Sequence, residues 1–141
     1  MQKVTKSMAF LIPIAVLLLT LAKVNTSLAA PMDKQIPGLV GTWVGENKTY
    51  SEHKGYSSWI KTVVIAEQKG RLFKGQFTYS GGTKHFFGVI YPDNTTFTWV
   101  STDSKGYNHG RIHSKDSISA CYTESGADAT VGCANLTRKN Q

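Results

Sequence analysis

From Gly41 to Arg138 the chain consists of about eight short runs, apolar or alternating, each closed by Gly, Pro, Asn or Asp. Alternation with a period of two residues is typical of strands that have one buried face. Sequential strands joined by short turns favour a meander, and closing the meander leaves no exposed sheet edge. The sequence therefore predicts an all-β fold, a single up-and-down antiparallel β-barrel of about eight strands in a domain spanning residues 39–139.

The predicted strands are separated mostly by connections of hairpin length. One connection is longer: residues 51–58 are polar and contain Gly55, which predicts a loop over one rim of the barrel. The strands are expected at residues 40–50, 59–68, 71–79, 84–90, 95–101, 107–113, 117–124 and 130–138.

The first 29 residues have the pattern of a secretory signal peptide. Lys3 and Lys6 precede an apolar stretch, residues 8–22, that is shorter than the roughly 20 residues a membrane-spanning helix needs. Small residues at Ser27 and Ala29 fit cleavage after Ala29, and cleavage after Ala30 is the alternative, as is an uncleaved N-terminal anchor. Residues 30–38 are then expected to form an extended leader, and the protein is expected to be periplasmic or secreted.

The basic residues do not form a cluster. Three of the 16 lie in residues 1–29, which leaves 13 against 9 acidic residues and a net charge of +4 after cleavage. The remaining cations, Lys61 among them, are scattered and are interpreted as a solvated surface. No run interleaves them with aromatic residues as a nucleic-acid platform would. We therefore expect no nucleic-acid partner, and no stable membrane anchor after signal cleavage.

Cys121 and Cys133 are expected to form a disulfide, since an exported chain meets an oxidising environment. They flank a turn centred near Ala127, which places them opposite each other on neighbouring strands. No C-x-x-C pair and no clustered His accompany either thiol, so a redox or metal role is not expected. If both cysteines face outward, alternation turns Tyr122 and Arg138 inward.

Arg138 then lies inside the barrel at the same end as Trp43. A Gly-x-Trp on the first strand, Gly41 to Trp43, with an arginine ending the last strand resembles the calycin superfamily, the lipocalins and avidins. In that superfamily the tryptophan plugs the closed end of an eight-stranded barrel and a late arginine packs over it. The resemblance therefore implies that Trp43 and Arg138 close the barrel. Avidins also carry late tryptophans that cover biotin, whereas none follows Trp99 here.

The opposite rim is expected to be open and rich in aromatic residues, with Tyr50 and Phe86 also assigned to it. Rings with a polar handle suit a concave site that buries an apolar or planar ligand and orients it by hydrogen bonds. The alternative is a filled core, because eight strands make a barrel narrow enough for side chains to fill. The candidate ligand-binding residues are Asn47, Trp59, Tyr79, Trp99, Tyr107 and Tyr122.

No catalytic constellation is evident in the sequence. His53, His85, His109 and His113 are not paired with a nucleophile, and the nine carboxylates occur singly. The sequence predicts a protein that is not an enzyme and that uses no cofactor and no metal.

Two functions are compatible with these features. The leading hypothesis is an exported binding protein for an apolar or aromatic small molecule at the open barrel end. The alternative is a periplasmic protein-binding module, such as an inhibitor of a protease or lysozyme. In that case the 51–58 loop, with Tyr56 as an exposed anchor, is the expected contact.

Overall fold

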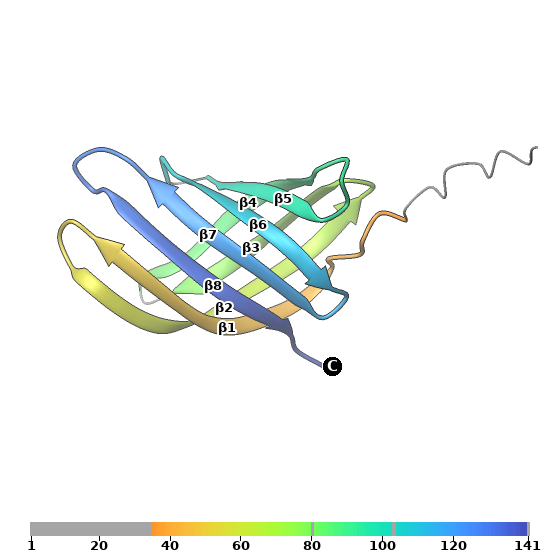
Figure 1. The fold of residues 1–141 in the computed structure, drawn as a ribbon, viewed down its shortest axis with the longest axis horizontal. Coiled ribbons are helices and arrows are strands. Elements are labelled where there is room, and N and C mark those ends of the chain that lie inside the picture. Colours follow the sequence, from red (N-terminus) through yellow and green to blue (C-terminus); the bar gives the residue numbers. More distant parts are fainter. Residues whose placement is uncertain (1–34, 80, 103, 141) are drawn as a thin grey trace, which may run out of the picture. The chain divides into compact units, whose positions relative to one another are not determined.

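In the computed structural model, residues 35–79, 81–102 and 104–140 are described. Within them, eight antiparallel strands form a closed barrel in which each strand pairs with its neighbours in sequence and β8 pairs with β1 (Figure 1). The predicted up-and-down β-barrel is therefore confirmed. The strands are β1 (Gly41–Ser51), β2 (Gly55–Lys69), β3 (Leu72–Tyr79), β4 (Gly82–Ile90), β5 (Thr96–Ser101), β6 (Tyr107–Ser114), β7 (Ser117–Glu124) and β8 (Thr130–Arg138).

The expected signal peptide, residues 1–29, lies outside the described residues, as do residues 30–34 of the expected leader. Residues 35–40 precede β1 without regular secondary structure. The described part of the chain has no helix long and apolar enough to cross a membrane.

The core lies inside the barrel and follows the period-two alternation of the strands. On β3 the inward side carries Phe73 and Phe77, and on β5 it carries Phe97 and Trp99, as the sequence predicts. Phe73 contacts Phe97 edge to face, with ring centroids 6.0 Å apart. These rings and the branched side chains of the neighbouring strands fill the barrel toward one end.

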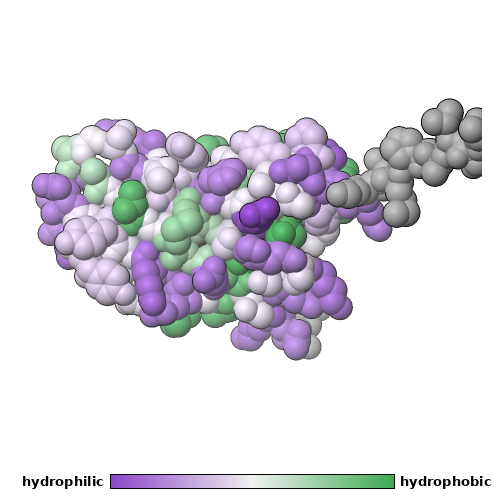
Figure 2. All heavy atoms as spheres, viewed as in Figure 1, coloured by the Kyte–Doolittle hydropathy of each residue, from purple (hydrophilic) through white to green (hydrophobic). Residues whose placement is uncertain are grey.

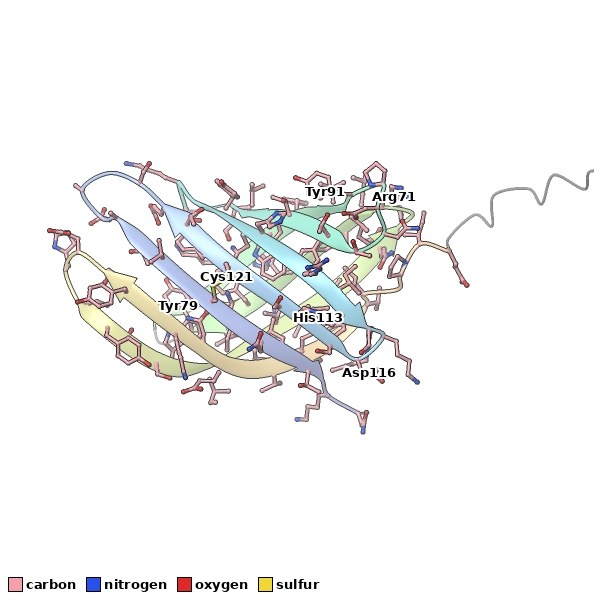
Figure 3. The ribbon with its side chains drawn as sticks, viewed as in Figure 1. Arg71, Tyr79, Tyr91, His113, Asp116 and Cys121 are labelled. Carbon is pink, nitrogen blue, oxygen red and sulfur yellow. A yellow bond between two sulfur atoms is a disulfide. The ribbon has the colours of Figure 1, made fainter. Side chains whose placement is uncertain are left out.

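That end is closed by the segment before β1 together with Arg138. Leu39 is buried in the core, and its carbonyl accepts a hydrogen bond of 2.9 Å from Trp43 Nε1. The Arg138 guanidinium lies over the Trp43 ring, with Cζ 4.1 Å from the ring centroid, and Nη2 donates to the Gly38 carbonyl at 2.8 Å. Asp116, which marks this end in Figure 3, lies 3.4 Å from Arg138 Nε. The expected contact between Trp43 and Arg138 is present.

The expected loop over residues 51–58 is wrong, because β2 begins at Gly55. Only residues 52–54 form the turn, and Thr49 pairs with Ser57 in the strand ladder. The hydroxyls of these two residues are 2.6 Å apart. Near the open end, inward positions are polar and bonded to each other, so polarity there does not indicate a loop.

Cys121 and Cys133 form the expected disulfide. They lie directly opposite each other on β7 and β8, with Cα atoms 4.0 Å apart (Cys121 is labelled in Figure 3). Their neighbours Ala120 and Ala134 are buried inside the barrel, so the cysteines face outward, as the sequence predicts.

Reducing the disulfide is expected to lower the melting temperature without unfolding the barrel at room temperature. The bond closes a loop between residues only 12 apart, for which chain entropy predicts at most about 3 kcal/mol of stabilisation. Thermal melting followed by circular dichroism, with and without reductant, measures the effect. The Cys121→Ser/Cys133→Ser variant in the absence of reductant is the control. An unchanged melting temperature, or complete unfolding at 25 °C, would contradict this expectation.

Candidate functional site

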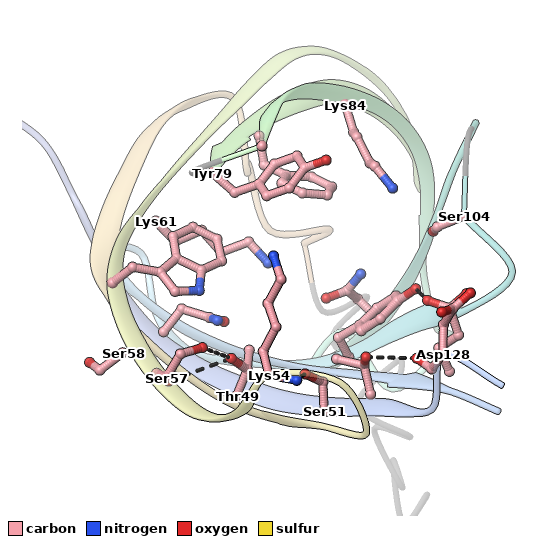
Figure 4. Close-up of a pocket in the computed structure, with 18 of the residues that line it drawn as sticks. Thr49, Ser51, Lys54, Ser57, Ser58, Lys61, Tyr79, Lys84, Ser104 and Asp128 are labelled. Atoms are coloured by element: carbon pink, nitrogen blue, oxygen red, sulfur yellow. Dashed lines mark hydrogen bonds between the residues drawn. The ribbon is translucent and has the colours of Figure 1, made fainter. Parts of the chain in front are cut away.

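The barrel interior is packed at one end and hollow at the other. At the end opposite Trp43 lies a cavity of about 650 Å³, lined by residues of every strand except β5 and by the turns beside them. Figure 4 looks at this cavity. A filled core therefore describes only one half of the barrel, and whether the hollow half binds a ligand stays a prediction.

Aromatic rings form two parts of the cavity wall. Trp59 on β2 and Tyr79 on β3 are in contact, with ring centroids 6.2 Å apart, and Phe77 lies 6.0 Å from Tyr79. Tyr122 lines the wall on β7, and its hydroxyl donates a hydrogen bond to the Glu124 carboxylate. Burial, followed by this hydrogen bond to Glu124, raises the pKa of Tyr122. Its hydroxyl is therefore a neutral donor.

Two buried amides add polar groups to the same cavity. Asn47 pairs with Trp59 across β1 and β2, and Asn108 pairs with Tyr122 across β6 and β7. The side chains are 4% and 1% exposed respectively. In the described part of the chain, Asn108 Oδ1 has no hydrogen-bond partner. Because a buried polar atom without a partner is costly, this oxygen marks a position where a ligand hydrogen bond would be favourable.

Lys61 is the most unusual residue of the cavity. Its side chain points inward from β2 and is only 4% exposed. Nζ lies 4.7 Å from the ring centroid of Phe77 and 5.8 Å from that of Trp99. Burial lowers the pKa of Lys61 to about 8. The interpretation of Lys61 as a solvated surface cation is therefore wrong.

Alternation along β2 contains the signal that this interpretation missed. Trp59, Lys61, Val63 and Ile65 share the inward side, and the last two are core residues. The sequence-based interpretation followed the residue type and not the periodicity, because lysine is almost never fully buried in proteins.

Two more lysines point into the cavity from other parts of its wall, Lys54 from the β1–β2 turn and Lys84 from β4 (Figure 4). Lys84 Nζ lies 5.8 Å from the Tyr79 ring centroid. Two carboxylates, Glu124 and Asp128, also line the cavity. Glu124 accepts the hydrogen bond from Tyr122, and Asp128 lies 3.1 Å from His53 at the rim.

Of the six candidate ligand-binding residues, Asn47, Trp59, Tyr79 and Tyr122 line the cavity. Trp99 does not. It is completely buried in the filled half, stacked between Phe86 and Phe97 with ring centroids 4.9 Å and 5.2 Å away. Its inward direction agrees with the prediction, but it lies in the filled half of the barrel and not at the open rim. Phe86, also assigned to the rim, belongs to the same buried stack.

Tyr107 is not in the cavity either, and its placement at the mouth is wrong. The register pairs Asn108 with the inward Tyr122, so Tyr107 faces outward and is 52% exposed. Two residues after Asn108, the inward position is Gly110, where an added Cβ would clash with the Phe97 ring. A glycine that makes room for a ring on the neighbouring strand β5 is the signal that shows which face of β6 points inward. Tyr50 likewise faces outward.

The cavity wall brings several kinds of binding group together. Among the described residues, no group of three His, Cys, Asp or Glu side chains is placed to hold a metal ion. The cavity combines ring surfaces, buried amides and ammonium groups, which together suit recognition of a small organic molecule.

Comparison with known proteins assigns the chain to no family. No protein-family model matches the chain, and no curated protein matches it. Among solved structures, a redesigned beta barrel is similar, with a TM-score of 0.45 and 17% sequence identity over 72% of this chain and 92% of that one.

Proposed function

We propose that this protein is an exported binding protein for a small molecule with an apolar or aromatic body, which enters the open end of the barrel. The half-filled interior is the observation that carries the proposal. The cavity of about 650 Å³ falls within the roughly 300–1,000 Å³ typical of small-molecule sites, and rings form much of its wall.

The arrangement of the walls favours binding by a preformed site. The rings of Trp59, Phe77 and Tyr79 offer apolar surface, and the buried amides of Asn47 and Asn108 offer hydrogen bonds that orient the guest. The packed half beneath holds these strands in place. A site that is already ordered loses little conformational entropy when a ligand binds.

The proposal includes export of the protein and a relationship to the calycins. The disulfide is compatible with an oxidising compartment, and residues 1–29 have the pattern of a signal peptide. The Arg138 guanidinium over the Trp43 ring supports kinship with the calycins. The position of the cavity, at the end away from this pair, agrees with a barrel closed at one end and open at the other.

Replacing Trp59 with alanine is expected to weaken binding by about tenfold or more, because a ring that covers a buried ligand contributes one to several kcal/mol. Tyr107→Ala is the matched control, since it removes an aromatic ring from the outer face. Isothermal titration with a panel of biotin, laurate, indole, naphthoate and naphthamide measures both. Absence of binding across the panel, or an equal loss in the two variants, would contradict the proposed site.

A second candidate function, binding of another periplasmic protein, is favoured by the outer surface. Outward side chains form a continuous cross-strand series near the open end: Tyr56 pairs with Tyr50, and Tyr50 with Val131. All three are exposed. Tyrosines of this kind are common anchors at protein interfaces. On the face shown in Figure 2, apolar residues occur as separate patches between polar ones.

This candidate now depends on strand residues rather than on the expected loop. Pull-down from a periplasmic extract with the wild type and with the Tyr50→Ser/Tyr56→Ser variant tests it. A defined partner that binds the wild type and not the variant supports protein binding. Equal recoveries from both proteins contradict it.

A further inference from the structure

We infer that the ligand of the cavity is an organic anion, with a planar or apolar body against the rings and an acidic group against the Lys61 ammonium. This inference rests on the proposed function and names the chemical class of its ligand. It is carried by the position of Lys61, deep in the barrel between the cavity and the filled half.

The protein compensates the positive charge of the Lys61 ammonium group incompletely. Its nitrogen lies over the faces of two rings, Phe77 and Trp99. Among the described residues, no carboxylate lies within ion-pair distance of Nζ, and desolvation is the only cause of its lowered pKa. A charge removed from water is costly unless an opposite charge or strong hydrogen bonds meet it. A ligand anion at this point supplies the missing charge.

The polar groups nearby suit an acidic head group. The amides of Asn47 and Asn108 line the cavity and are almost completely buried. Each amide has an NH₂ group that is able to donate to a carboxylate oxygen. Asn108 Oδ1, which has no partner within the described residues, accepts a hydrogen bond from a protonated or hydroxylated group of the guest. The hydrogen bonds from the amide NH₂ groups to a carboxylate are charge-assisted and therefore stronger than neutral ones.

Two further lysines lie nearer the entrance of the cavity than Lys61 does. Lys54 and Lys84 point into the lumen from different parts of the wall (Figure 4). The two carboxylates of the cavity interact with Tyr122 and with His53. Together with Lys61 deeper in the lumen, Lys54 and Lys84 place three ammonium groups against two carboxylates among the described residues that line the cavity.

Binding should depend on pH through Lys61. Its pKa is about 8 in the empty site, and a bound anion raises it, so affinity is expected to fall by up to about tenfold per pH unit above pH 8. Other ionisable groups line the same cavity, so a variant that lacks the Lys61 amine has to serve as the reference. These groups are His53, Lys54, Tyr79, Lys84, Tyr122, Glu124 and Asp128.

Isothermal titration with naphthoate and with its neutral isostere naphthamide tests the inference. The wild type is expected to bind naphthoate about tenfold or more tightly than naphthamide at pH 7, because a charge-assisted contact is stronger than a neutral one. Lys61→Met is expected to remove this preference and the fall in affinity above pH 8, while it still binds naphthamide. Lys48→Met, which removes a charge from the outer surface, is expected to change neither.

The outcomes separate this inference from the function on which it rests. Equal affinities of the wild type for the two probes, or a preference for naphthoate that survives in Lys61→Met, would overturn the anion assignment and leave the small-molecule site standing. Failure of the wild type to bind either probe would count against both the proposed function and the anion assignment.

Discussion

Replacing Trp43 with alanine is expected to lower the free energy of unfolding by about 3–5 kcal/mol, the range found when large buried rings are truncated. Trp43 is completely buried, donates a hydrogen bond to the Leu39 carbonyl and lies under the Arg138 guanidinium. The substitution therefore leaves a void and disconnects the segment that covers the closed end. Since domains of this size are typically stable by only about 5–15 kcal/mol, much of the total stability is lost.

Chemical denaturation followed by circular dichroism measures this loss. Trp59→Ala is the matched control, because Trp59 is half-buried and lines the cavity instead of the packed end. We expect the control to lose far less stability than Trp43→Ala. Equal losses in the two variants would show that the two ends of the barrel do not differ as described.

Replacing Lys61 with methionine is expected to raise the free energy of unfolding at pH 7 by about 3 kcal/mol. Burial lowers the pKa of Lys61 from its ordinary value of 10.5 to about 8, and each pKa unit corresponds to about 1.4 kcal/mol. Below pH 8 the lysine is charged in both the folded and the unfolded states, and the folded state bears the cost of the buried charge. An unbranched apolar side chain of similar length avoids that cost.

The sign of the pH dependence follows from the same shift. Between pH 8 and pH 10.5 the unfolded chain binds more protons at Lys61 than the folded chain, so the stability of the wild type rises with pH in this window. The Lys61→Met variant lacks this contribution, and its advantage is expected to shrink by about 3 kcal/mol between pH 7 and pH 10.5. Denaturation curves across this range, with Lys48→Met as control, measure it. Parallel profiles for the wild type and Lys61→Met would contradict a buried ammonium.

A stabilising substitution that removes binding is the usual mark of a functional residue. Lysine at position 61 makes the unliganded barrel less stable than methionine would. Its proposed function is the recognition of an anion. The two predictions for this residue are therefore linked: the variant that folds more stably is the one that loses its preference for an acidic ligand.

Much of the fold follows from local patterns. The clear alternation of Phe73 with Phe77, and of Phe97 with Trp99, fixed the inward faces of β3 and β5 correctly. The short turn between Cys121 and Cys133 fixed the register of the last hairpin and, with it, the inward direction of Arg138. In these segments the side-chain pattern and the turn chemistry agree, so a single interpretation is possible.

The errors at the site have three physical origins. Alternation along a strand gives the face of a residue but not its level along the barrel axis, which depends on the stagger between strands. For this reason Trp99 was predicted at the mouth, whereas it lies in the core. On β6 neither face is clearly apolar, so the direction of Tyr107 depended on Gly110 and its close contact with Phe97. Lys61 is the third case, because the residue type suggested the surface where the period indicated the interior.

The indole N–H signals of Trp43, Trp59 and Trp99 test the central claim, a barrel closed at one end and open to a ligand at the other, most directly. The three tryptophans lie at the closed end, on the cavity wall and in the core beneath the cavity. In a nuclear magnetic resonance titration with naphthoate and naphthamide, the Trp59 signal is expected to shift strongly, the Trp99 signal less, and the Trp43 signal hardly at all. No shift at Trp59, or a larger shift at Trp43 than at Trp59, would contradict the account.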